Sequence, residues 1–277
     1  MAAGAHGRPA GRGAAADDTA DGALRWAGRA GFTARGVVYV LVGYLALRIA
    51  FGKGSDEADR QGALRTVADQ PLGRAVLWLL VAGFAGMALW RAASAAFGRG
   101  KDGKPGKRAL NAGRALFYAA VCWGTAAFAL GSGGQSSSDD TSKDWTASAL
   151  DLPAGRYLVG AAGLVLAGVG VGTAVRALRR RFLERLDTAA MGPRVRTAVT
   201  ACGVAGNTAR GLVFAAAGAF AVTAAVRFDP QRAKGLDDTL RSLATTPVGP
   251  WLLVLTAVGL LLFGAFSFAS ARWRRLS

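Results

Sequence analysis

Six apolar blocks, each close to the ~20 residues that an α-helix needs to cross a bilayer, limit what this chain can fold into. Of its 277 residues, 52% are hydrophobic and only 18% are charged, a balance that is unusual for a soluble domain. We therefore predict an all-α polytopic membrane protein with six transmembrane helices. The predicted spans are Arg35–Phe51, Leu72–Phe97, Asn111–Leu130, Gly155–Val175, Gly203–Val226 and Val248–Ala269.

Positive charge is concentrated in alternate connections between these blocks. Residues 1–35, 91–114, 176–210 and 272–275 carry net charges of +2, +6, +6 and +3, which together equal the net charge of the chain, +17. The remaining connections sum to zero. Because basic residues stay on the cytoplasmic side of a membrane, we expect both termini in the cytoplasm. Topology accounts for the basic residues, so no nucleic-acid partner is expected.

A short motif around an arginine occurs three times. The stretch TARGVVYVLVG at Thr33–Gly43 returns as TARGLVFAAAG at Thr208–Gly218, identical at six of eleven positions, and more loosely as AGRALFYAAVC at Ala112–Cys122. Each copy is followed by a Pro-x-Gly step, where proline suits the first turn of a return helix. The steps begin at Pro71, Pro153 and Pro247.

These repeats predict three parallel two-helix units around a pseudo-three-fold axis along the membrane normal. We place the units at residues 25–98, 107–178 and 195–272, in one membrane domain of residues 25–272. Residues 1–24 have no apolar core, and we expect them to form a disordered cytoplasmic tail.

Short outer helices are expected before the proline steps. Leu64, Val67 and Ala68 have the i, i+3, i+4 spacing of an amphipathic helix, and Leu240, Leu243 and Ala244 repeat it. Such helices suit the outer membrane–water interface, where they cover the hairpins.

Together, the TARG-type motif, the short outer helix and the Pro-x-Gly step, tripled over six spans, resemble a bacterial membrane family known as domain of unknown function 1206. The resemblance covers about Trp26–Arg272, and Gly113 and Ala115 around Arg114 make the second unit the most divergent. It implies paired transmembrane helices repeated three times, in the inner membrane of a bacterium. It implies no established activity and no site residues.

The three repeated arginines are the candidate binding residues. Each lies at the edge of an apolar block that contains no Asp or Glu, and an aromatic residue follows four positions later, so a ring is expected to cover each guanidinium group. An asparagine also precedes two of the arginines by one helical turn. The full candidate set for an anion or lipid headgroup is Arg35, Arg114, Arg210, Tyr39, Tyr118, Phe214, Asn111 and Asn207.

Two interpretations of these arginines stay open. In the first, each arginine and its ring set the depth of a helix, with lipid phosphate as the partner. In the second, the three arginines converge near the pseudo-three-fold axis and attract a small anion. The basic connections are expected to attract anionic headgroups in either case, at about 1 kcal/mol per basic residue.

Other residues inside the spans are interpreted as packing elements. Gly168 and Gly172 form a GxxxG step, which predicts a close-packing face on the fourth span. Cys122 and Cys202 are expected to be inert buried thiols, because they lie far apart inside apolar blocks.

The leading functional hypothesis is a non-enzymatic membrane module that organises lipid or a partner protein. The alternative is a channel or transporter-like conduit for a small anion. The sequence contains one histidine and no catalytic motif, so we expect no enzyme activity, catalytic residue, metal site or cofactor.

The charge pattern makes a topology prediction that can be tested directly. A reporter fused after Ser277 should register as cytoplasmic, and a reporter inserted in the stretch Gly131–Ser138 should register as external. Reversed signals would contradict the assignment of the basic connections to the cytoplasm.

Overall fold

In the part of the chain that the structure describes, every long secondary-structure element is a helix. This computed structural model describes residues 11–51, 60–97, 105–131, 138–152, 154–227, 229, 234, 238–240 and 249–275. The α-helices include α1 (Gly11–Ala50), α2 (Arg60–Ala68), α3 (Gly73–Phe97), α4 (Pro105–Ala129), α5 (Ser138–Leu150), α6 (Gly155–Leu178), α7 (Pro193–Arg227) and α9 (Gly249–Trp273). Two short 3-10 helices, Arg181–Arg185 and Thr188–Ala190, lie between α6 and α7.

Five of these helices are long and apolar enough to cross a membrane. They are Gly22–Ala50 of α1, all of α3, α6 and α7, and Trp251–Trp273 of α9. The sequence predicts one further span, Asn111–Leu130, the third in chain order, which corresponds to α4. Within the described residues α4 falls outside this set, because Arg114, Tyr118 and Trp123 reduce its apolar character. An all-helical, multi-pass membrane protein is the class that these helices indicate.

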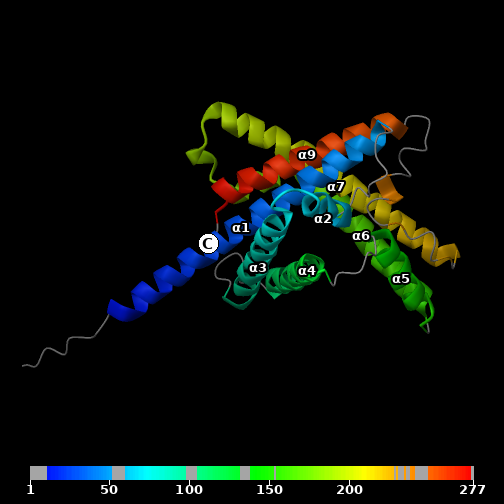
Figure 1. The fold of residues 1–277 in the computed structure, drawn as a ribbon, viewed down its shortest axis with the longest axis horizontal. Coiled ribbons are helices and arrows are strands. Elements are labelled where there is room, and N and C mark those ends of the chain that lie inside the picture. Colours follow the sequence, from blue (N-terminus) through cyan, green and yellow to red (C-terminus); the bar gives the residue numbers. More distant parts are fainter. Residues whose placement is uncertain are drawn as a thin grey trace, which may run out of the picture.

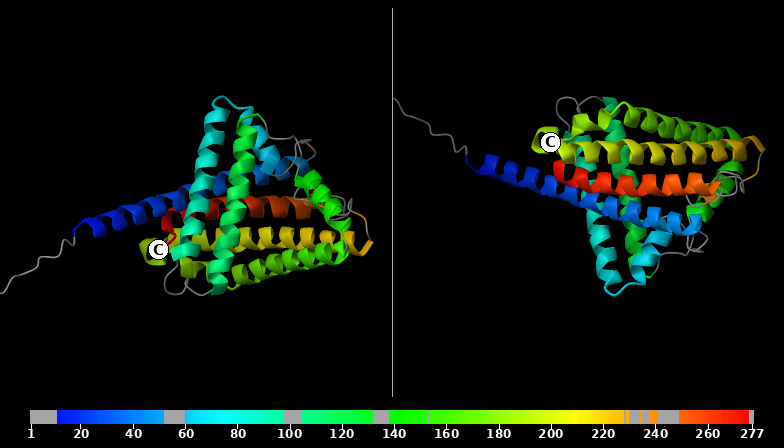
Figure 2. Two further views of the ribbon diagram at one scale, coloured as in Figure 1. Left: turned by 90° about the horizontal axis from the view of Figure 1, so that it is seen from below. Right: turned by 90° about the horizontal axis from the view of Figure 1, so that it is seen from above.

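Four helices lie side by side in a layer, in the order α6, α7, α9, α1 (Figures 1 and 2). The pair α3 and α4 runs across this layer, with α3 packed on α1 and α4 packed on α3 (Figure 2). The first and third units therefore pack their own two helices together. The second unit departs from the predicted hairpin, since α4 packs on α3 and α6 packs on α7.

Glycines explain why α6 pairs with α7. A Cβ atom on Gly170 would lie 2.5 Å from the carbonyl oxygen of Gly211, and one on Gly163 would lie 2.9 Å from that of Gly218. Backbones this close gain dispersion contacts that bulkier residues prevent. The predicted GxxxG face is wrong in its register, because Cβ atoms on Gly168 and Gly172 would meet no atom within 4 Å.

The beginning of α1 lies within residues 1–24, the segment for which we predict a disordered cytoplasmic tail. Residues 1–10 lie outside the described residues, but the chain is helical from Gly11, and Figure 1 shows this part of α1 extending beyond the other helices. Ala14, Ala15 and Ala16 favour this, since alanine has the highest intrinsic helix propensity.

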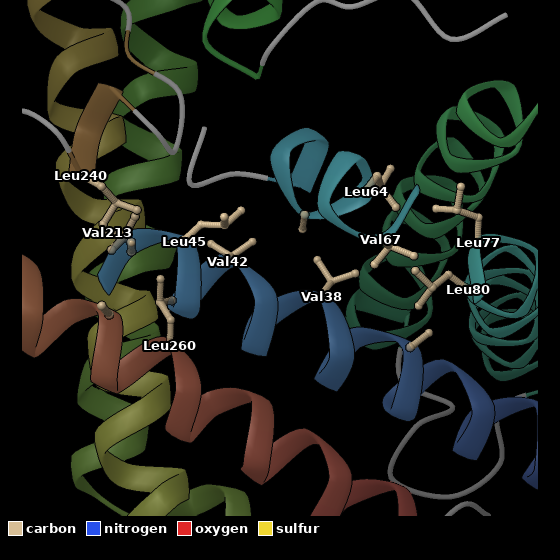
Figure 3. Packing of buried hydrophobic residues seen from close by; sticks show 14 of the residues in the cluster. Val38, Val42, Leu45, Leu64, Val67, Leu77, Leu80, Val213, Leu240 and Leu260 are labelled. Atoms are coloured by element: carbon tan, nitrogen blue, oxygen red, sulfur yellow. The ribbon is translucent and has the colours of Figure 1, made fainter. Parts of the chain in front are cut away.

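The first outer helix forms, and Leu64 and Val67 of its predicted face are buried, whereas Ala68 is exposed. Leu64 and Val67 of α2 are buried against Val38 and Val42 of α1 and Leu77 of α3 (Figure 3). In the third copy Leu240 is buried in the same cluster, whereas Leu243 and Ala244 lie outside the described residues. The first outer helix therefore closes one end of the bundle over α1 and α3.

The glycine contacts give a matched pair of variants. Gly170→Ala should lower the free energy of unfolding by about 1–3 kcal/mol, because the added methyl group forces α6 away from α7. Gly168→Ala is the control, since its methyl group enters open space. Thermal unfolding of the purified protein in detergent measures both, and an unchanged midpoint for Gly170→Ala would contradict this packing.

Candidate functional site

Arg35 lies in α1 where this helix packs on α9. Its Nε donates a hydrogen bond to Ser267 Oγ at 3.1 Å. Its guanidinium carbon lies 4.7 Å from the ring centroid of Phe32 and 5.0 Å from that of Phe263. The Tyr118 side chain of α4 lies near this guanidinium group. Arg35 thus interacts with groups from α1, α4 and α9.

Arg210 approaches Arg35 from α7 and stacks on one of the same rings. Its guanidinium carbon lies 4.9 Å from the Phe263 centroid and 4.8 Å from the Phe214 centroid. The contact with Phe214 confirms the prediction that the ring four residues after this arginine covers its guanidinium group. The corresponding prediction for Tyr39 is wrong. The guanidinium group of Arg35 lies over Phe32 and Phe263, whereas the Tyr39 ring centroid lies 5.7 Å from the guanidinium carbon of Arg210.

Arg114 of α4 is half-buried and faces the same region. Its positive charge interacts with those of Arg210 and Arg185. The predicted stacking of Tyr118 on Arg114 is not observed in the described part of the chain: Tyr118 stacks on Phe84 instead, with ring centroids 6.4 Å apart. The fold therefore brings the three repeated arginines into one region, but each of them has different neighbouring side chains.

A fourth arginine, Arg91, joins them near the end of α3. It is only 8% exposed, and its guanidinium carbon lies 4.3 Å from the Trp90 centroid. Its Nη1 donates to Asn111 Oδ1 at 3.2 Å. A sequence signal existed, because Arg91 follows Pro71 by 20 residues, as Ser267 follows Pro247. Equivalent positions of two units thus contribute to the same region.

The C-terminal segment adds Arg274. The backbone N–H of Asp187 donates to Trp273 O at 2.8 Å, that of Arg275 donates to Arg185 O at 3.1 Å, and Arg275 pairs with Asp187 at 3.4 Å. This pairing holds Arg274 with its guanidinium carbon 4.7 Å from the Phe32 centroid. Burial lowers the pKa of Arg274 well below its ordinary value, and repulsion from Arg91 and Arg35 adds to this shift.

These five residues, Arg35, Arg91, Arg114, Arg210 and Arg274, are called the arginine cluster below. Among the described residues, no carboxylate forms an ion pair with any of them. Cation–π contacts of about 0.5–2 kcal/mol each offset part of the repulsion. Two buried nitrogens, Nε of Arg91 and Nε of Arg210, have no hydrogen-bond partner in the described part of the structure. The cluster is therefore suited to an anion.

The two candidate asparagines have different roles. Asn111 is buried and accepts from Arg91, whereas Asn207 Nδ2 donates within its own helix to Gly203 O at 2.7 Å. Only Asn111 therefore contacts the arginine cluster. The two cysteines, Cys122 and Cys202, are free, and they are half-buried rather than buried as predicted.

A surface cavity of about 540 Å³ lies at the other end of α3 and α4. Arg65, Arg74, Leu77 and Phe128 contribute to its lining. None of its lining residues belongs to the arginine cluster, so the two features are separate.

The asparagines give a second matched pair of variants. Asn111→Ala should lower the free energy of unfolding by roughly 1.5–3 kcal/mol, because it leaves the buried Arg91 without its acceptor. Asn207→Ala should cost less, since it removes a bond within one helix. Thermal unfolding compares the two, and equal losses would contradict the role assigned to Asn111.

Comparison with known proteins agrees with the resemblance seen in the repeats. The family model described as Domain of Unknown Function (DUF1206) matches three stretches, residues 30–98, 111–180 and 205–274. A Bacillus subtilis (strain 168) protein described as "Uncharacterized protein YxxB" is 30% identical over 254 residues, which cover 90% of this chain and 91% of that protein. No solved structure matches. With three family matches along most of its length, this chain belongs to the DUF1206 family.

Proposed function

We propose that this protein is a non-enzymatic module of the bacterial cell membrane that organises anionic lipid through its arginine cluster. The observation that carries the proposal is the convergence of arginines from all three units, without a carboxylate partner among the described residues. Phosphate groups of lipids are the most abundant anions at a membrane surface, and guanidinium groups bind them through paired N–H donors.

The position of the cluster supports lipid as the ligand. It lies where α3 ends, where the C-terminal segment meets the α6–α7 connection, and beside the middle of α1. In the proposed topology α4 also spans the membrane, which gives six spans. Both termini are cytoplasmic, and this end of the bundle faces the cytoplasmic headgroups. Each basic residue near such a surface contributes about 1 kcal/mol of attraction.

The chemistry of the side chains supports a binding role. The groups that converge are guanidinium, phenol, amide and hydroxyl groups, from Arg35, Tyr118, Asn111 and Ser267 among others. Such groups hold an anion by hydrogen bonds and charge. A protein partner at the basic connections is compatible with the same role.

Native mass spectrometry on protein extracted gently from its own membrane tests this proposal. The triple variant Arg35→Gln, Arg114→Gln, Arg210→Gln should lose bound lipid about tenfold or more relative to wild type, because charge-assisted hydrogen bonds are removed. The matched control is Arg179→Gln, Arg194→Gln, Arg196→Gln, which removes the same charge from exposed positions on α6–α7.

The control distinguishes a site from general attraction. Equal lipid retention in the two triple variants would contradict the proposal. Anion flux into liposomes that disappears only in the first variant would instead favour the conduit that the repeated arginines also suggest.

A further inference from the structure

Arg91 is held in place by one hydrogen bond and one aromatic ring. Its side chain is more than nine-tenths buried, and its Nη1 donates a hydrogen bond to Asn111 Oδ1. Trp90 covers one face of its guanidinium group. Its Nε is buried without a partner in the described part of the chain. A buried, unpaired N–H on a charged group costs free energy, which an anion would recover.

Arg35 and Arg274 come close to Arg91 through two shared rings. The guanidinium carbons of Arg35 and Arg274 each lie 4.7 Å from the Phe32 centroid. Those of Arg91 and Arg274 lie 4.3 Å and 5.8 Å from the Trp90 centroid. Phe32 and Trp90 themselves make an edge contact, with centroids 5.8 Å apart. One aromatic pair thus gathers three guanidinium groups from α1, α3 and the C-terminal segment.

Three positive charges around one aromatic pair favour a ligand with more than one negative charge. A phosphate monoester carries about −1.5 to −2 charges at pH 7 and offers three acceptor oxygens, whereas a phosphodiester carries a single charge. Guanidinium groups match these oxygens in pairs. The hydrogen bond from Arg35 Nε to Ser267 Oγ and the rings of Phe32 and Phe263 fix the orientation of the Arg35 guanidinium group.

We infer that Arg35, Arg91 and Arg274 form a binding site for a phosphate monoester or inorganic phosphate. This inference rests on the proposed function, because it names the chemical group that part of the same cluster takes. The ligand is held by these three side chains, and the pairing of the C-terminal segment with residues 185–187 keeps Arg274 in place. The same chemistry comes from two sources, a lipid headgroup such as phosphatidic acid or free phosphate.

The test uses the full chain, purified in detergent and stripped of lipid. Inorganic phosphate is titrated at constant ionic strength, with chloride as the reference anion, and binding is followed by phosphorus NMR line broadening. In parallel, the protein is placed in nanodiscs that contain either phosphatidic acid or phosphatidylglycerol, and retained lipid is counted by native mass spectrometry.

Arg274→Gln is the main variant, because Arg274 follows the last helix and its loss leaves the spans intact. Arg91→Gln is the second. Arg272→Gln is the matched control, since Arg272 is exposed at the same end and its guanidinium group stacks on Trp273 outside the cluster. Both cluster variants should weaken binding about tenfold, and the control should bind as wild type does.

Each outcome decides the inference. Phosphate binding without lipid that is lost in Arg274→Gln identifies free phosphate as the ligand. A preference for phosphatidic acid over phosphatidylglycerol that is lost in the same variant identifies a lipid monoester. Absence of binding by both probes, or equal binding in Arg274→Gln and Arg272→Gln, overturns the inference. Arg114 and Arg210 are untouched here, so failure of this site is separable from failure of general lipid retention.

Discussion

The accumulation of arginine charge beside an apolar bundle is the constraint on which the rest of this structure depends. Five guanidinium groups repel one another, and no carboxylate in the described part of the chain neutralises them. Aromatic rings offset this repulsion, chiefly Phe32, Trp90 and Phe263, each of which faces two arginines. Hydrogen bonds to Ser267 and Asn111 hold two of the groups in place. The remaining unpaired nitrogens, Nε of Arg91 and Nε of Arg210, are the donors that the proposed anion would use.

Helix packing makes the arginine cluster asymmetric. The glycine contacts between α6 and α7 take the second helix of the middle unit to the third unit, while α4 stays with α3. Arg114 therefore belongs to a helix, α4, that packs on α3 and not on α6, the other helix of its unit. It also lacks the ring contact that Arg210 makes with Phe214. A single site built from unlike surroundings follows from this packing. It suits one phosphate-bearing ligand better than a symmetric ring of three arginines would.

Much of the architecture was predictable because the signals are local. Apolar length predicts spans, Pro71 predicts the start of a return helix, and the spacing of Leu64 and Val67 predicts a short outer helix with a buried face. The contacts of Tyr39, Tyr118 and the GxxxG glycines were wrongly predicted for one shared reason. Spacing along one helix indicates which residues share its face, but a neighbouring helix decides which atoms meet that face.

The sequence by itself determined the membrane class, the three repeats, the family and the positions of the repeated arginines. These properties depend on composition and on order along the chain. The tertiary structure alone decided that Arg35 and Arg210 share Phe263, that Arg91 joins them through Asn111, and that a backbone bridge brings in Arg274. Such contacts join residues far apart in the sequence, so they depend on close packing between helices, which no local pattern encodes.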